Sequence, residues 1–438
     1  MEKTLNITFL FSVFFLSFGL IHLGCYSSDK VDDKTFVVAT YDDVKDWDPA
    51  TAFSLELLPM SNIYEPLLWY DPKTDGFNPG LATSYSKSKD GLVWDFKLRD
   101  SVYFHDGSQF NAETVKFVVE RNKTLNGGAS YIWSSVEKII IKDPQQVRFI
   151  LSSPVPLDKI VSSQYGAWMY SPSFSKVSTS ILNNGFGSGT GPYRLKKWVR
   201  NKFVLLEKFH EYWKGWPRRS HFDNVLIQVV SEASTRYQMV ESGLADYATL
   251  IPYQLIEKLE KDPRVNVSYH PSWTNEFYLL NTKKPPTDNL WLRRAIASSL
   301  DRKTLSNQVY KNTAVESKGL IPQNIPLFLE PDSLVGFDLE VAKNFLKKSG
   351  LEPKHTNLDL SYVSTYEAYR LTAFMLLDNL RKIGIDLDLK PGLWSTNWDK
   401  AKKIETAPNI ISMAWWPTIS SPSDWFFSLY STQEKPIF

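Results

Sequence analysis

The segment LVWDFKLRDSVYFHDGSQFNAETVKFVV, residues 92–119, carries the pattern that decides the fold class. Residues 92–98 alternate apolar with other side chains, and this period of two predicts a strand. A second short strand is predicted at residues 102–104, ending in a turn at residues 105–107. Asn111 then fits the N-cap position of a helix. That helix would carry an apolar stripe of Val115, Val118 and Val119.

The alternation of strands and helices continues on both sides of this segment and predicts α/β layering. Upstream, residues 35–40 predict a strand. Downstream, a helix starts near Glu232 and stops at Gly243, and a helix at about residues 366–383 leads into a strand at residues 385–389. Other predicted helix boundaries are the N-caps Asn289, Asp301 and Asp338 and the C-terminal glycines Gly350 and Gly384. The sequence contains no heptads, internal repeats or low-complexity tract.

The composition is that of an ordinary globular protein, and the 438 residues suffice for two or three lobes. Hydrophobic residues make up 43% and charged residues 22%, with a formal net charge of +2. Bulk electrostatics therefore give no support to nucleic-acid binding. Aromatic residues reach 14%, which indicates either a large aromatic core or a pocket lined partly by aromatic rings.

The cysteine and histidine content argues against a cysteine-based metal site or a zinc site, and no motif requires a cofactor. Cys25 is the one cysteine, so neither a disulfide within the chain nor a cysteine-based metal site can form. The six histidines are scattered, with no pair at helical ligand spacing. Residues 189–191 (Gly-Thr-Gly) lack the Lys-Ser or Lys-Thr that a P-loop requires. Their glycines are predicted to permit a tight entry of the chain into the strand that begins at Tyr193.

The N-terminus has the layout of an export signal. Lys3 precedes an apolar run at residues 7–21, and small Gly24 and then Cys25 close it before a polar stretch. A membrane-spanning helix needs ~20 apolar residues, so this run is short for one. A permanent transmembrane anchor is the alternative interpretation.

Leu23-Gly24-Cys25 resembles the end of a bacterial lipoprotein signal, in which the cysteine becomes the new N-terminus and carries lipid. This resemblance implies a signal peptide at residues 1–25, a linker at residues 26–34, and a protein held at the membrane by lipid on Cys25. Its location would be the periplasm or the cell surface.

Several sequence blocks follow one another in a recognisable order. They are residues 78–82 (NPGLA), 94–99 (WDFKLR), 104–107 (FHDG), 111–113 (NAE), 189–193 (GTGPY), 211–215 (EYWKG), 241–246 (ESGLAD), 292–296 (LRRAI) and 300–302 (LDR). Together they resemble the extracellular solute-binding proteins, family 5, of peptide and nickel ABC transporters. The similarity runs from about residue 36 to the last residue.

The resemblance implies an α/β fold of the periplasmic-binding-protein type II-like class, with two lobes joined by a hinge and an inserted subdomain. Lobe I would hold residues 35–66 and 184–268, the inserted subdomain residues 67–183, and lobe II residues 269–438. In this family the last segment returns to lobe I, and here that return is expected to be missing. We therefore expect the 438-residue form to purify poorly, although such proteins act as monomers.

The pocket departs from the family pattern. Peptide-binding relatives place an aspartate, which pairs with the peptide amino group, where Thr418 stands here. A buried ammonium without an anionic partner is costly, so a free peptide N-terminus is disfavoured. Trp415 and Trp416 offer flat apolar or cation–π surfaces, with core packing as the alternative. Further candidate ligand-binding residues, each as compatible with a core position, are Tyr41, Trp168 and Tyr278.

The resemblance implies an ABC importer component that captures an oligopeptide-like solute by lobe closure and delivers it to a permease with its ATPase. Nickel chelate, haem and oligosaccharide stay open as solutes. A secreted hydrolase and a surface adhesin are the alternative functions. Against the hydrolase, no catalytic triad can be read, His105 is expected in a turn, and Asp42, Asp43 and Asp48 are expected to be solvated. We therefore predict no catalytic residues.

Overall fold

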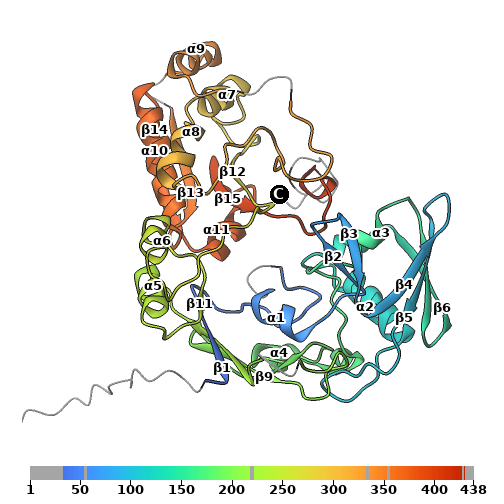
Figure 1. Ribbon diagram of the computed structural model, residues 1–438. Helices are drawn as coiled ribbons and strands as arrows, with labels where there is room; N and C mark the ends of the chain where they lie inside the picture. The colour runs from blue at the N-terminus through green and yellow to red at the C-terminus, as the bar shows by residue number, and fades with distance from the viewer. Residues whose placement is uncertain are drawn as a thin grey trace, which may run out of the picture.

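The computed structural model describes residues 33–53, 57–217, 221–331, 335–352, 356–426 and 429. The predicted signal peptide, Cys25 and most of the linker lie outside these residues. Figure 1 shows two bodies, one above the other, with a third body beside the lower one. We call the lower body lobe I, the upper body lobe II and the third the inserted unit, and define each by its sheet.

Lobe I is built on a five-stranded sheet in the order β11-β1-β10-β9-β8. Its strands are β1 (Thr35–Thr40), β8 (Tyr193–Val199), β9 (Phe203–Lys208), β10 (Asn224–Val229) and β11 (Tyr247–Ala248). β1 pairs in parallel with β10 and β11, and the other pairs are antiparallel. The predicted first strand is confirmed, and its buried apolar run suits a strand covered on both faces. The helices near this sheet are α1 (Leu57–Ile63), α4 (Thr179–Asn183), α5 (Ala233–Glu241) and α6 (Tyr253–Leu259).

The inserted unit contains an antiparallel sheet in the order β4-β5-β7-β6 and a separate hairpin, β2-β3. Its strands are β2 (Leu68–Asp71), β3 (Gly76–Pro79), β4 (Ala82–Lys87), β5 (Val93–Leu98), β6 (Val136–Asp143) and β7 (Gln146–Leu151). Its helices are α2 (Ala112–Leu125), α3 (Leu157–Ile160) and the 3-10 turns η1 (Ser130–Trp133) and η2 (Pro172–Lys176).

In this unit the predicted strand at residues 92–98 and the predicted helix capped by Asn111 are both confirmed. Trp94, Phe96 and Leu98 on β5 are buried, as the alternation predicts. The Asn111 side chain accepts a hydrogen bond from Thr114 N at 3.1 Å, which caps α2.

The predicted strand at residues 102–104 is wrong. Only an isolated bridge forms there, between Tyr103 and Gln109. Phe104 N donates to Ser108 O at 2.8 Å, because the chain reverses immediately after this residue. The two arms of the turn are therefore too short for a ladder.

One hydrophobic core runs through lobe I and the inserted unit. It joins Val38 and Leu206 of the lobe I sheet to Trp94 and Phe149 of the inserted sheet. The two bodies are therefore packed as one, although they have separate sheets.

β8 begins at Tyr193, as predicted, and the Gly-Thr-Gly block before it lies directly against α1. A Cβ on Gly189 would lie 2.0 Å from Ile63 O, and one on Gly191 would lie 2.4 Å from Asn62 O. Gly191 N also donates to Ile63 O at 2.9 Å. Only residues without a side chain let the two backbones come this close.

Lobe II has a four-stranded sheet in the order β12-β15-β13-β14. Its strands are β12 (Asn275–Leu280), β13 (Asn357–Val363), β14 (Asp386–Gly392) and β15 (Ile410–Trp415). Its helices are α7 (Leu290–Ser298), α8 (Arg302–Thr304), the π-turn η3 (Leu305–Val309), α9 (Leu339–Ser349), α10 (Glu367–Lys382), α11 (Trp394–Ala401) and α12 (Ser423–Trp425). The predicted N-caps Asn289, Asp301 and Asp338 accept backbone hydrogen bonds, and Gly350 and Gly384 adopt positive φ.

Candidate functional site

Residues 415–424, from the last residue of β15 into α12, contact the inserted unit, and we call them the bridging segment. Trp416 Nε1 donates to the Tyr165 hydroxyl at 2.9 Å. Ser163 Oγ donates to Thr418 O at 2.5 Å. This stretch of lobe II is therefore fixed by side chains far away in the sequence.

Asp424 forms hydrogen bonds within the bridging segment and to the inserted unit. Its side chain is buried, and Oδ2 accepts from Trp415 Nε1 at 3.1 Å and from Thr418 N at 3.0 Å. Oδ1 accepts from the Tyr131 hydroxyl of η1 at 2.9 Å. Burial raises the pKa of the Asp424 carboxyl, and these hydrogen bonds oppose that rise. Both oxygens are thus occupied within the protein.

The three ligand candidates at the end of β15 come together on the bridging segment. Trp415 is buried, with its ring 6.3 Å from that of Phe53. Thr418 is also buried, and its Oγ1 lies 2.7 Å from the Tyr131 hydroxyl. Trp416 is 40% exposed, so it alone of these three presents a large accessible surface.

The other ligand candidates occupy different surroundings. Trp168 is buried in the shared core, where its ring packs near Tyr64 and Trp69. Tyr278 packs against the lobe II core from β12. Tyr41 directly follows β1 and is partly exposed. Packing within cores accounts for the positions of Trp168 and Tyr278.

An aromatic cluster surrounds the bridging segment on its lobe II side. Trp415 and Trp425 form its buried centre together with Met413, Ile321 and Ile325. The partly buried aromatic residues against it are Phe53, Trp273, Phe277, Phe328, Trp394 and Trp398. The high aromatic content noted in the sequence is therefore concentrated in part at this junction.

Sequence reasoning missed Asp424, Tyr131, Tyr165 and Phe53. The contact between Tyr131 and Thr418 joins positions 287 residues apart, which no local pattern encodes. Asp424 did have a signal, since an acidic residue stands directly before the apolar run Trp425-Phe426-Phe427.

The expected solvation of the acidic loop is wrong for two of its members. Asp43 is buried and accepts from Trp198 Nε1 at 3.0 Å and Asn201 N at 2.6 Å. Asp48 is buried and forms an ion pair with Arg121 at 2.6 Å. A buried carboxylate persists only with such partners. The contacts of Asp43 and Asp48 therefore stabilise the loop that follows β1.

His105 lies in its predicted turn and has structural contacts. Its Nε2 lies 2.9 Å from Gly191 O. Burial lowers the pKa of the imidazole to about 4. In the part of the chain that the structure describes, no group of three His, Cys, Asp or Glu side chains is placed to hold a metal. Across those same residues, no helix has the length and apolar character needed to cross a bilayer.

Residues 76–436 match the family model for bacterial extracellular solute-binding proteins, family 5 (middle). This chain belongs to that family. The recognition made from the sequence blocks is confirmed, since the match covers most of the chain.

A curated relative of this family 5 chain is the glutathione-binding protein GsiB of Escherichia coli O6:K15:H31. The two are 30% identical over 342 residues, which is 76% of this chain and 65% of the relative. The chain thus spans less than two thirds of that relative's length.

Solved structures similar to this family 5 chain include peptide-binding and nickel-binding proteins. The periplasmic binding protein DppA of Helicobacter pylori, in complex with the peptide STSA, is 24% identical with a TM-score of 0.80, covering 90% of this chain and 80% of that one. The dipeptide-binding protein of Pseudoalteromonas sp. SM9913, with Met-Leu, is 23% identical with a TM-score of 0.81, covering 90% and 82%. NikA of Staphylococcus aureus, with Ni(L-His)2, is 20% identical with a TM-score of 0.80, covering 92% and 82%. The predicted type II-like α/β fold is confirmed.

Proposed function

We propose that this chain is the substrate-binding component of an ABC importer and captures a small, oligopeptide-like solute between its lobes. Family membership supports the class of function, and the bridging segment supports the location. That segment carries Trp415, Trp416 and Thr418 at the junction of lobe II with the inserted unit. The buried carboxylates Asp43, Asp48 and Asp424 are engaged in internal contacts. They therefore give no support to a secreted hydrolase or an adhesin.

Capture would follow from lobe closure. A solute shifts the equilibrium between open and closed forms only if it binds the closed form more tightly. Trp416 would contribute ring surface, and Trp415 and Thr418 would shape the site beneath it. Tyr41, the most accessible of the remaining candidates, would add to this site, whereas Trp168 and Tyr278 would support it from the two cores.

The domain division belongs to this proposal. Residues 35–66 and 184–268 would move as lobe I together with the inserted subdomain at residues 67–183, because one core joins them. Residues 269–438 would move as lobe II. The chain would be exported, anchored by lipid at Cys25 and monomeric, and it would pass its solute to a permease.

Peptides and glutathione are the proposed solutes, since three of the four proteins named above, GsiB, DppA and the dipeptide-binding protein, are described as binding such compounds. A solute whose cationic end needs a free carboxylate at position 418 is disfavoured, because Thr418 is neutral and Asp424 is already occupied. The amide groups of a peptide and an aromatic or aliphatic side chain suit Trp416 better.

The test is a tryptophan-fluorescence titration of the full chain with glutathione, trialanine and N-acetyl-trialanine. Saturable binding of at least one compound is expected, with acetylation of trialanine costing less than threefold in affinity. The Trp416→Ala variant should weaken binding at least fivefold, whereas Trp291→Ala on α7 should not. No saturable binding to these compounds or to a wider peptide library would contradict the proposal.

A further inference from the structure

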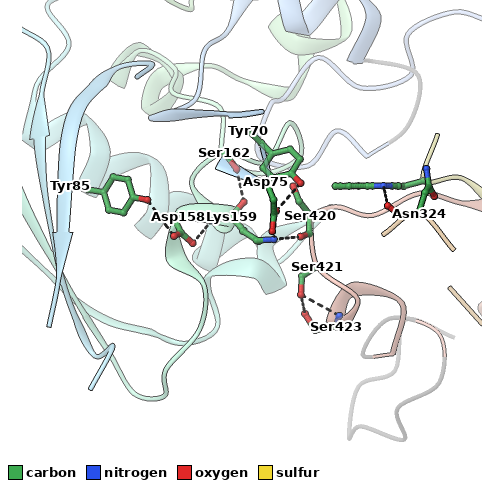
Figure 2. Close-up of polar contacts among 11 residues, drawn as sticks. Tyr70, Asp75, Tyr85, Asp158, Lys159, Ser162, Asn324, Ser420, Ser421 and Ser423 are labelled. Carbon is green, nitrogen blue, oxygen red and sulfur yellow. Dashed lines mark hydrogen bonds and ion pairs between the residues drawn. The ribbon is translucent and has the colours of Figure 1, made fainter. Parts of the chain in front are cut away.

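A lysine of the inserted unit reaches across to the bridging segment. Lys159 lies in the short helix α3, and its side chain is only 18% exposed. Its Nζ donates to Ser420 O of lobe II at 2.8 Å and to Asp75 Oδ1 at 2.9 Å. Figure 2 shows the ammonium between these two oxygen atoms, one from each side of the junction. The contact with lobe II uses a backbone carbonyl, so it does not depend on the side chain at position 420.

The Lys159 ammonium is held in place by Asp75 and Tyr70, which belong to the same inserted unit. Asp75, in the β2–β3 turn, also accepts from the Tyr70 hydroxyl at 2.9 Å. Partial burial alone would raise the pKa of Asp75, but the hydrogen bonds from Lys159 and Tyr70 bring that pKa below its ordinary value. Lys159 Nζ also lies 5.6 Å from the centre of the Tyr70 ring. The lysine is therefore oriented by a carboxylate and an aromatic face before it meets lobe II.

Tyr70 makes a second contact with lobe II. The Tyr70 ring centre lies 5.6 Å from the ring of Trp273, which stands just before β12. Trp273 Nε1 donates to Asn324 O at 3.3 Å. Lys159, Asp75 and Tyr70 thus touch lobe II at two places, the bridging segment and the approach to β12.

We infer that Lys159 is a positioning residue that fastens the inserted unit to lobe II and sets how long the solute stays bound, without touching the solute. The inference rests on the proposed function in one respect, because residence time needs a solute. A contact made in one arrangement of the lobes and lost in another stabilises the first by its own free energy. Breaking it would leave the Ser420 carbonyl without this donor and Asp75 without its cation.

The first test needs no solute and measures the distance between lobe II and the inserted unit. Spin labels are placed on exposed Lys138→Cys of β6 and Lys347→Cys of α9, in a full chain with Cys25→Ser so that only these thiols react. Lys159→Met should broaden the distance distribution and shift it to longer values. The matched control is Lys176→Met, an exposed lysine of the same unit. Identical distributions for the two variants would overturn the inference.

The second test measures dissociation of glutathione by stopped-flow fluorescence. Lys159→Met should speed dissociation about tenfold, as expected for losing a hydrogen bond to a charged group. Asp75→Asn should give a smaller increase, and Lys159→Arg should restore most of the residence time. If Lys159→Met lowers the melting temperature but leaves the dissociation rate unchanged, the role is structural and the inference fails. If the wild type binds no glutathione, the proposed solute fails, while the spin-label distances still decide the role of Lys159.

Discussion

At the scale of single residues, the buried Asp424 joins three groups of the candidate site by hydrogen bonds. Its carboxylate receives a hydrogen bond from η1 and two from the bridging segment itself. The sequence could not indicate the role of Asp424, because one of its hydrogen-bond donors, Tyr131, comes from a distant part of the chain. For the same reason Asp43 and Asp48 were expected in solvent and are instead buried with partners.

Replacing Asp424 by Asn should destabilise the protein. Asparagine keeps one acceptor oxygen and replaces the other with an NH2 donor, so the three donors from Trp415, Thr418 and Tyr131 can no longer all be accepted at this position. We expect the free energy of unfolding to fall by about 1–3 kcal/mol, measured by urea denaturation. Asp399→Asn on α11, where the carboxylate is 70% exposed, is the control and should change that free energy by less than ~0.5 kcal/mol. Equal effects of the two substitutions would contradict the role assigned to Asp424.

Glu276 makes the stability dependent on pH. Glu276 lies on β12 with its Oε1 buried, and its other carboxylate oxygen accepts a hydrogen bond from the Tyr310 hydroxyl. Its charge also raises the pKa values of three nearby tyrosines, Tyr278, Tyr366 and Tyr369. The Tyr253 hydroxyl lies 3.3 Å from that of Tyr366, and Tyr41 is close enough to raise the pKa of Tyr366. Burial raises the pKa of Glu276 from 4.5 to about 7.

Between these two pH values the folded protein keeps a proton that the unfolded chain has lost. The free energy of unfolding should therefore fall as pH rises from 4.5 to about 7, by roughly 2–3 kcal/mol. Glu276→Gln removes the titrating group and should abolish this part of the pH dependence. Urea denaturation of both proteins at pH 5 and pH 8 measures it, and parallel pH profiles would refute the assignment.

At the scale of elements, the sequence predicted those strands and helix ends that depend on interactions within a few residues. The period of two in β5 and the caps Asn111 and Asp338 are confirmed, because burial of alternate side chains and satisfaction of terminal N–H groups act within a few residues. Residues 102–104 have strand-like composition, but the adjoining turn leaves them a single bridge. Sheet order and the packing of the bridging segment depend on distant contacts, which composition does not encode.

The approach of the Gly-Thr-Gly block to α1 can be tested by adding one methyl group. Gly189→Ala places a Cβ 2.0 Å from Ile63 O, and this backbone oxygen cannot move without shifting α1. We expect the free energy of unfolding to fall by more than ~2 kcal/mol. Gly336→Ala is the matched control, since nothing lies within 4 Å of its Cβ. Similar thermal melting curves for the two variants would show that the close approach is not required.

At the scale of the whole molecule, the resemblance of the sequence blocks predicted the two-lobed fold, and the family match confirms the recognition. The continuous core between lobe I and the inserted unit was not predicted. Under the proposed function, lobe II would therefore move against one larger body. The bridging segment and Lys159 lie where those bodies meet, so solute capture and lobe position would be coupled there.

The most direct test of solute capture is native mass spectrometry of the full chain purified from its own cells without denaturation. The account predicts one small, peptide-class compound bound per chain and released on unfolding, with less of it retained by Trp416→Ala and Lys159→Met than by Trp291→Ala. A wild-type chain that carries no solute, and acquires none from a peptide library, would contradict it.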